Sequence, residues 1–206
     1  MVDHRTPIPS DFRLYLASQS PRRQSLLRDI GVPYEVVRSS AEEALEGDTP
    51  AALAAANAVA KVRGASLPAG APAGVFILGT DTLVTLDDRV MGKPASRDEA
   101  KAMISELSGR THQVVSGVAL LAKGRLRVAT ASTDVTFLEL DDRSIDAYIA
   151  SGEWTDKAGA YGIQGLAGMF VSEVRGEYSN VVGLPLCLLA GLFREAGFDL
   201  LRRQWL

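Results

Sequence analysis

The chain has 206 residues, of which 47% are hydrophobic and 23% charged, so it can bury one sizeable core and is not a disordered protein. Its net charge of −3 excludes a general basic surface of the kind that draws proteins to nucleic acid or to anionic membranes. The single cysteine, Cys187, excludes an internal disulfide and a cysteine-based zinc site, and its apolar surroundings predict a small core residue.

The first eleven residues carry prolines and charges but no apolar segment, which predicts that the chain has no secretory signal. No uninterrupted apolar stretch reaches the length of a membrane-spanning helix. We therefore expect a cytoplasmic protein with no membrane partner and no nucleic-acid partner.

The first predicted elements are a buried strand and a helix that follows it after a sharp turn. Leu14–Ala17 suits an interior strand, Ser20 is a preferred N-cap residue, and Pro21 suits the first helical position. The amides and the positive dipole end of such a helix attract phosphate, and Arg22 and Arg23 add two guanidinium groups there. The pattern predicts an anion-binding loop, although an ordinary helix start with solvated arginines would have the same sequence.

A second strand and an alanine-rich helix are predicted next. Tyr34–Val37 is the strand, and acidic residues that include Glu43 follow it. A threonine and Pro50 form another N-cap pair, which opens a helix that carries Asn57 and Lys61 toward its far end.

The central strand is predicted at Val75–Leu78, ending at a Gly-Thr-Asp-Thr segment that contains Asp81. A carboxylate directly after a buried strand is costly to bury unless it binds a cation or a partner, so Asp81 is a candidate metal ligand or general base. The alternative is a turn aspartate that bonds to the backbone. Lys93, between a glycine and a proline, could hold a phosphate or be a surface lysine.

The remaining elements follow from caps, alternation and glycines. In chain order they are a helix that begins after Ser96 and ends near Gly109, strands over His112–Leu121 and through Phe137, a helix over Arg143–Ala150, a glycine-rich segment Asp156–Gly165, a strand over Met169–Val174, and a helix from Pro185 through Phe193.

This alternation predicts an α/β fold with a mixed sheet, forming a single domain over residues 1–206 with a core at about 12–197. The sequence contains neither a P-loop nor a nucleophile elbow, and its glycines lack dinucleotide spacing. The two histidines are far apart, and His112 is expected to be packed or hydrogen-bonded rather than catalytic.

Polar residues at the ends of apolar elements lie where open α/β sheets bind their ligands. Arg22, Arg23 and Lys93 supply cations, while Glu43 and Asp81 supply hard oxygen ligands suited to magnesium or manganese. Such a set suits a polyphosphate with its metal. In metal-assisted attack of water on a phosphoanhydride, carboxylates fix the metal and the water, and cations stabilise the charge that leaves with diphosphate.

The sequence resembles the Maf family of nucleoside triphosphate pyrophosphatases over about Leu14 to Pro185. The resemblance rests on several motifs in the family's order, which are Ser18-Gln19-Ser20-Pro21-Arg22-Arg23, Gly79-Thr80-Asp81-Thr82, Gly92-Lys93-Pro94 and Asp156-Lys157-Ala158-Gly159-Ala160-Tyr161-Gly162-Ile163-Gln164-Gly165. Several motifs in register are far more specific than any one of them.

The resemblance implies hydrolysis of a nucleoside triphosphate to the monophosphate and diphosphate with a divalent cation, Mg²⁺ or Mn²⁺. It also implies an inosine-triphosphatase-like fold, a twisted mixed sheet with two lobes around a central cleft, and a homodimer. Asp81 would accept the proton, and Glu43 with Asp81 would hold the metal. The phosphates would be contacted by Arg22, Arg23, Lys61 and Lys93, with Ser18 lining the same loop.

Within the family, Thr82 and Gln164 match the branch that acts on dTTP and UTP, with modified pyrimidine nucleotides as further candidate substrates. A neutral amide can pair with a pyrimidine edge, whereas the branch acting on 7-methyl-GTP tends to carry Gln and Glu at these places. The alternatives are therefore a 7-methyl-GTP pyrophosphatase, or a non-catalytic nucleotide-binding regulator of cell division, since the family's historical name refers to septum inhibition. Thr80, where the family often has Ala, is a departure expected to affect only loop packing.

Overall fold

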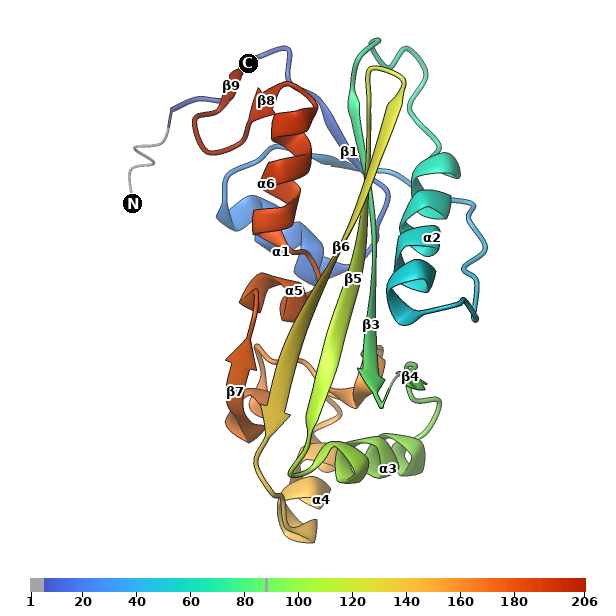
Figure 1. Cartoon of the computed structure of the whole chain (residues 1–206), viewed down its shortest axis with the longest axis vertical. Coiled ribbons are helices and arrows are strands. Elements are labelled where there is room, and N and C mark those ends of the chain that lie inside the picture. The colour runs from blue at the N-terminus through green and yellow to red at the C-terminus, as the bar shows by residue number, and fades with distance from the viewer. Residues whose placement is uncertain (1–5, 88) are drawn as a thin grey trace.

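A mixed sheet runs through the length of the molecule (Figure 1). The structure is a computed structural model and describes residues 6–87 and 89–206. The strands of the sheet are β1 (Leu14–Leu16), β2 (Glu35–Val36), β3 (Phe76–Leu86), β4 (Arg89–Met91), β5 (Thr111–Ala122), β6 (Arg125–Phe137) and β7 (Val171–Arg175). Their order is β2-β1-β3-β5-β6-β7, with β4 paired to β3. Strand β1 is parallel to β2 and β3, and the other pairs are antiparallel. The predicted α/β class with a mixed sheet is confirmed.

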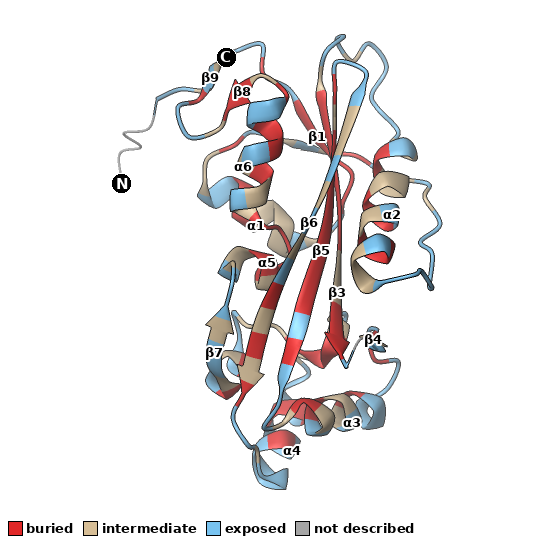
Figure 2. Ribbon diagram, viewed as in Figure 1, coloured by how far each residue is buried: buried red, intermediate tan, exposed pale blue. Residues whose placement is uncertain are grey.

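The long strands β3, β5 and β6 carry a hydrophobic core near each end, so the molecule has two lobes (Figure 2). One lobe is built with α1 (Pro21–Asp29), α2 (Pro50–Arg63) and α6 (Leu186–Glu195), and the other with α3 (Arg97–Leu107) and α4 (Asp142–Ser151). Side chains alternate between the faces of a strand, and Leu78 of β3 packs into the core with α1 and α6 while Ile77 packs against α2. The predicted two-lobed arrangement is confirmed.

Helix α2 lies unusually close to the sheet because two glycines face it. A Cβ atom at Gly79 of β3 would overlap the Ala58 carbonyl oxygen, and one at Gly117 of β5 would overlap the carbonyl of Ala54. Glycine is the residue that permits such an approach of two backbones. The polar side chains of α2 are thereby brought within bonding distance of β3.

The predicted N-caps of two helices are confirmed. The Thr49 hydroxyl accepts from the Ala52 amide at 3.1 Å at the start of α2, and the Ser96 hydroxyl accepts from the Glu99 amide at 3.2 Å at the start of α3. Each bond satisfies one of the orphan amides of a helix start.

The prediction that the central strand ends at the segment Gly79–Thr82 is wrong, because β3 continues without a break through this segment to Leu86. Pairing with β5 runs along this whole stretch, with Asp81 opposite Gly117. Asp81 is therefore a strand residue and not a turn aspartate. Thr80 lies in the same strand and is fully buried, so its departure from the family pattern affects the strand and not a loop.

The C-terminal part differs from its prediction in detail. Two 3₁₀ helices, η1 (Ala158–Ala160) and η2 (Leu166–Phe170), precede β7, and α5 (Tyr178–Val182), β8 (Phe198–Asp199) and β9 (Gln204–Trp205) were not predicted. Cys187, predicted to be a core residue, is exposed, because α6 turns Leu189, Leu192 and Phe193 inward instead. No helix in the described ranges is both long and apolar enough to cross a bilayer.

Candidate active site

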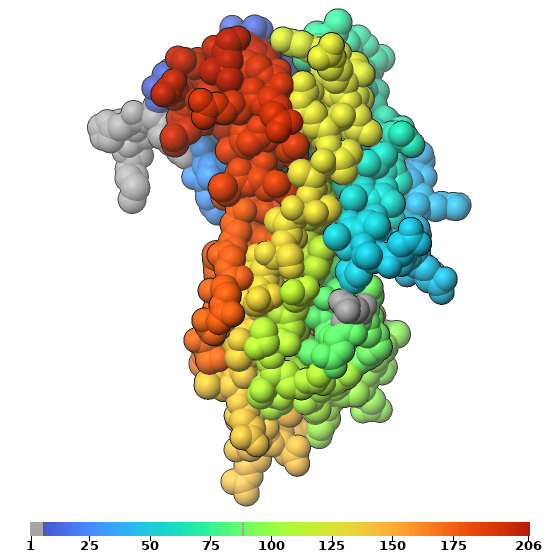
Figure 3. All heavy atoms as spheres, in the orientation of Figure 1, coloured from blue at the N-terminus to red at the C-terminus, as the bar shows by residue number. Residues whose placement is uncertain are grey.

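A cavity of about 810 Å³ lies where the two lobes meet, a volume within the usual range for small-molecule sites. Its walls come from the β1–α1 loop, the segment before α2, β3, β4 and the glycine-rich segment. Figure 3 shows the segment before α2 projecting from the side of the molecule above the lobe that contains α3. All the site residues predicted from the sequence line this cavity, namely Ser18, Arg22, Arg23, Glu43, Lys61, Asp81, Thr82, Lys93 and Gln164.

Asp81 occupies the stretch of β3 between the two cores, just beyond the point where its neighbour β1 ends at Leu16. Its residue surface is only 7% exposed, and its side chain points to the face covered by α2. Oδ1 accepts from the Lys61 ammonium at 2.7 Å and Oδ2 accepts from the Asn57 amide at 3.2 Å. Each oxygen retains a lone pair that could accept from a water in the cavity.

Lys61 joins two carboxylates from distant parts of the chain. Its ammonium lies 2.7 Å from Asp81 Oδ1 and 2.8 Å from Glu43 Oε1, and it also donates to the Thr80 carbonyl at 3.3 Å. The Glu43 side chain is 53% exposed, whereas that of Lys61 is only 12% exposed. The two carboxylates predicted as metal ligands therefore converge on one cationic position.

This convergence fits a hard divalent cation. Within the described ranges, no group of three or more carboxylate, imidazole or thiol side chains is arranged to hold a metal. Mg²⁺ is commonly held by one or two carboxylates together with waters and substrate phosphates, so Glu43 and Asp81 would suffice as protein ligands if a metal arrived with a polyphosphate.

Arg23 is fixed in the wall by three different segments. Its Nε donates to the Gly183 carbonyl at 2.9 Å, Nη1 to the Ser18 hydroxyl at 2.9 Å and Nη2 to the Thr82 hydroxyl at 3.2 Å. A guanidinium has five donors, so two N–H groups remain for an anion. Burial lowers the pKa of Arg23 to about 10, with Asp81 opposing the shift, and the group stays charged at neutral pH.

The predicted anion-binding loop lies at the start of α1 as expected, but the N-cap bond expected of the Ser20 hydroxyl is absent. Ser20 occupies the N-cap of α1, yet its hydroxyl makes no capping bond; instead the Ser20 amide donates to the Ser18 hydroxyl at 3.3 Å. Arg22 follows in the first turn, where burial lowers its pKa and the charge of Asp156 partly restores it. The helix start and both arginines face the same cavity, so the arginines are not merely solvated surface groups.

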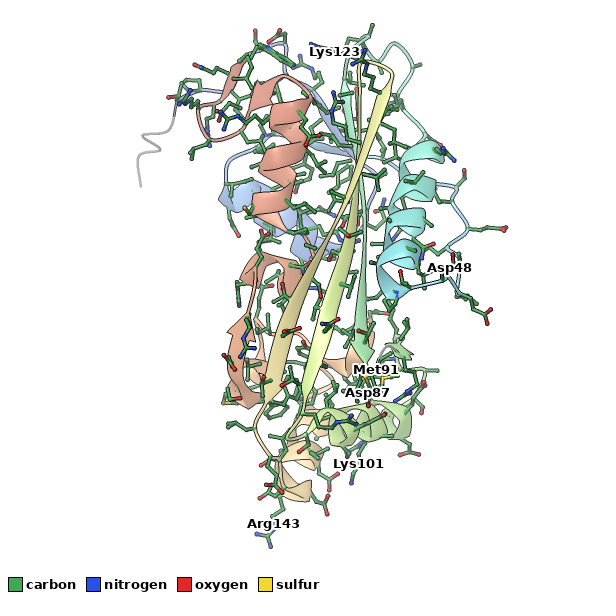
Figure 4. The ribbon with its side chains drawn as sticks, viewed as in Figure 1. Asp48, Asp87, Met91, Lys101, Lys123 and Arg143 are labelled. Carbon is green, nitrogen blue, oxygen red and sulfur yellow. The ribbon has the colours of Figure 1, made fainter. Side chains whose placement is uncertain are left out.

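Lys93 and Gln164 lie at exposed positions of the cavity wall, on two loops that are tied together. The Gly159 amide of the glycine-rich segment donates to the Gly92 carbonyl at 3.0 Å. In Figure 4, Met91 marks the end of β4 just before this loop, and Asp48 marks the segment that precedes α2. The roles assigned to Lys93 and Gln164 stay predictions, but their placement beside one cavity is what those roles require.

His112 is buried, as predicted, and lies outside the cavity wall. Its Nε2 is 2.8 Å from the Tyr161 hydroxyl, and burial lowers its pKa to about 4. A neutral, packed imidazole is the structural role expected from the sequence.

Ser116, Gly183 and Asn57 bond to predicted site residues but were not themselves predicted to belong to the site. The Thr82 hydroxyl bonds the Ser116 hydroxyl at 2.8 Å and the Gly183 carbonyl at 3.3 Å, and Asn57 bonds Asp81. Only for Asn57 did the sequence contain a signal: it lies four residues before Lys61, a spacing that places both side chains on the same face of α2.

Comparison with known proteins supports a common family. A family model described as Maf-like protein matches residues 13–196. A Bacillus anthracis protein named dTTP/UTP pyrophosphatase is 43% identical over 188 residues, which are 91% of this chain and 97% of that protein. A Symbiobacterium thermophilum protein of the same name is 44% identical over 189 residues, covering 91% and 96%. A solved HAM1 protein from Coxiella burnetii aligns with 61% of this chain and 73% of its own, at 18% identity and a TM-score of 0.43.

Proposed function

The chain belongs to the Maf family, and we propose that it is a nucleoside triphosphate pyrophosphatase that hydrolyses dTTP and UTP to the monophosphate and diphosphate. The observation that carries this proposal is the meeting of Glu43 and Asp81 with Arg22, Arg23 and Lys61 in one cavity. Carboxylates and cations from distant segments form the arrangement that a triphosphate with its metal requires.

Asp81 is the proposed proton acceptor for the attacking water. Its carboxylate is held by Lys61 and Asn57, so its direction into the cavity is fixed before substrate arrives. Positioning the acceptor in this way lowers the entropic cost of bringing water and phosphorus together.

The cations are proposed to bind the phosphate chain and to stabilise the negative charge that leaves with diphosphate. Arg23 has two N–H groups free of the bonds described above, and Arg22 and Lys93 add charge on either side of the cavity. Glu43 and Asp81 would hold a divalent ion, Mg²⁺ or Mn²⁺, which when bound neutralises phosphate charge and polarises the reacting group.

Recognition of a pyrimidine is proposed to fall mainly to Gln164. Its exposed carboxamide can both donate to and accept from a base edge, whereas the Thr82 hydroxyl is already engaged by Arg23 and Ser116. Thr82 would then shape the wall beside the base. We also propose a homodimer and a cytoplasmic location, in line with the family resemblance.

The test is turnover of a panel of nucleoside triphosphates, namely dTTP, UTP, 7-methyl-GTP and the other three ribonucleoside triphosphates, with magnesium and product analysis. We expect diphosphate release to be fastest with dTTP and UTP. Release of orthophosphate, or turnover confined to 7-methyl-GTP, would contradict the proposal. A regulator that only binds nucleotide would show affinity without turnover, and analytical ultracentrifugation would test the dimer.

A further inference from the structure

Asn57 forms a bridge between the acidic loop, defined as residues 41–48, and the carboxylate of Asp81. It is 3% exposed and lies in the middle of α2. Its Oδ1 accepts from the Ala44 amide at 2.8 Å, and its Nδ2 donates both to the Ala44 carbonyl at 3.1 Å and to Asp81 Oδ2 at 3.2 Å. One buried carboxamide therefore uses its acceptor and both of its donors on these two segments.

The orientation of this amide is set by its neighbours. Turning the group over would place its oxygen against the Ala44 carbonyl and the Asp81 carboxylate, and its NH₂ against the Ala44 N–H. All three contacts would become repulsive. The observed arrangement is thus the one in which every bond has a donor and an acceptor.

The acidic loop is held mainly by polar contacts, among them those of Asn57 and the ion pair of Glu43 with Lys61. Residues 42–48 are exposed, and Leu45 at their centre is 89% exposed, so the hydrophobic core contributes little to their position. The start of the loop is tied near the end of α2, where Ser39 Oγ donates to the Lys61 carbonyl at 3.0 Å, and the loop ends at the Thr49 N-cap. Between these ends, Asn57 hydrogen-bonds to the backbone of Ala44, the residue that follows Glu43.

We propose that Asn57 is a positioning residue that sets the distance between the two metal-binding carboxylates, Glu43 through the backbone of Ala44 and Asp81 directly. This inference rests on the proposed metal-dependent pyrophosphatase function. Groups that orient metal ligands typically change metal affinity or activity by about 10- to 100-fold when they are removed. The side chain itself need not touch the nucleotide.

The first experiment measures the loop without metal or substrate. A glutamate-specific protease is applied to wild type and Asn57→Ala, and cleavage after Glu42, Glu43 and Glu46 is followed by mass spectrometry. We expect cleavage in the variant to be about tenfold faster, because loss of two backbone bonds raises the population of the open loop. Asn180→Ala is the matched control, because Asn180 is also buried and donates to a backbone carbonyl, that of Val114, but does not contact the loop. Its cleavage rate should equal that of wild type.

The second experiment measures Mn²⁺ binding by electron paramagnetic resonance with a non-hydrolysable dTTP analogue present. We expect Asn57→Ala to raise the Mn²⁺ dissociation constant about tenfold, while KM for dTTP at saturating metal changes less than twofold. In a Glu43→Gln background the same substitution is expected to change Mn²⁺ affinity less than twofold, because the ligand that Asn57 places is already gone.

Unchanged loop cleavage and Mn²⁺ affinity in a folded Asn57→Ala protein would overturn the inference, as would full additivity with Glu43→Gln. Asn57→Ser, too short to reach Ala44 and Asp81 together, replaces the alanine variant if that one fails to fold. Absence of dTTP and UTP turnover in wild type would instead contradict the proposed function. The protease measurement distinguishes the two failures because it requires no catalysis.

Discussion

The role proposed for Asp81 depends on one negatively charged oxygen of its side chain. Asp81→Asn keeps the size of the side chain but removes the negative oxygen that would accept the proton, and we expect turnover of dTTP to fall on the order of 10²- to 10⁴-fold. Lys61 retains its ion pair with Glu43, so the variant should fold. Steady-state kinetics with circular dichroism as the folding control checks this, and undiminished turnover would remove Asp81 from its role.

The imidazole of His112 makes stability depend on pH. Burial lowers its pKa from 6.5 to about 4. Between these two pH values the imidazole is mostly protonated in the unfolded chain and mostly neutral in the folded protein. Stability contributed by the neutral imidazole is therefore complete above pH 6.5 and is lost as the pH falls toward 4. Between pH 7 and pH 5 we expect a loss of about 2 kcal/mol from this group.

His112→Gln isolates that contribution, because glutamine can still bond to the Tyr161 hydroxyl but does not titrate. Urea unfolding of both proteins at pH 7 and pH 5 gives the comparison. The pH-dependent loss should be smaller in the variant by about 2 kcal/mol. Equal losses in the two proteins would show that the imidazole is not the source.

At the scale of elements, the distance between α2 and the sheet decides whether Asn57 and Lys61 reach Asp81. Gly117→Ala would push a methyl group into the carbonyl of Ala54 and force the helix outward. We expect a loss of about 1–3 kcal/mol in the free energy of unfolding, measured by urea denaturation, together with a fall in kcat.

Gly191→Ala in α6 is the matched control, because a Cβ there meets no atom within 4 Å. Alanine is the better helix former, so this variant should gain up to about 1 kcal/mol without a change in kcat. Equal effects at the two positions would mean that the close approach of α2 is not what Gly117 provides.

The elements that the sequence predicted correctly carry local signals. Thr49 and Ser96 each cap a helix with a bond to an amide three residues away, and such bonds depend only on neighbouring residues. Gly79 was misinterpreted as a strand end because the reason for that glycine lies in α2, which packs against it. The short strands β8 and β9 pair only with each other near the C-terminus, and no local pattern indicates them.

At the scale of the whole molecule, the order of the motifs predicted which side chains would meet, and the cavity contains all of them. The bonds that connect them were not predictable from spacing. Arg23 donates to the Gly183 carbonyl from 160 residues away in the sequence, and Thr82 donates to the same carbonyl from 101 residues away. Contacts over such separations become visible only in the folded structure, where these three residues form one part of the cavity wall. Asn57 was visible as a polar residue in the helix, but its partners were not.

Because substrate would contact both sides of this wall, its binding should stabilise the whole chain. A non-hydrolysable dTTP analogue with magnesium, at about 100 times its dissociation constant, should add about 2.7 kcal/mol to the free energy of unfolding. For a chain of this length that corresponds to a rise in Tm of roughly 5–10 °C, measured by scanning calorimetry.

Glu43→Gln should lose the part of this rise that depends on magnesium, since one of the two carboxylates that would hold the ion is gone. Lys101→Ala is the surface control: Lys101 pairs with Asp146 on the outer side of the α3 lobe (Figure 4) and does not line the cavity. The ligand-induced rise in Tm of this variant should equal that of wild type, because Lys101 lies outside the cavity. A magnesium-independent rise in wild type would argue that the carboxylates do not hold the metal, and would leave Lys61 as their counter-ion in the bound state.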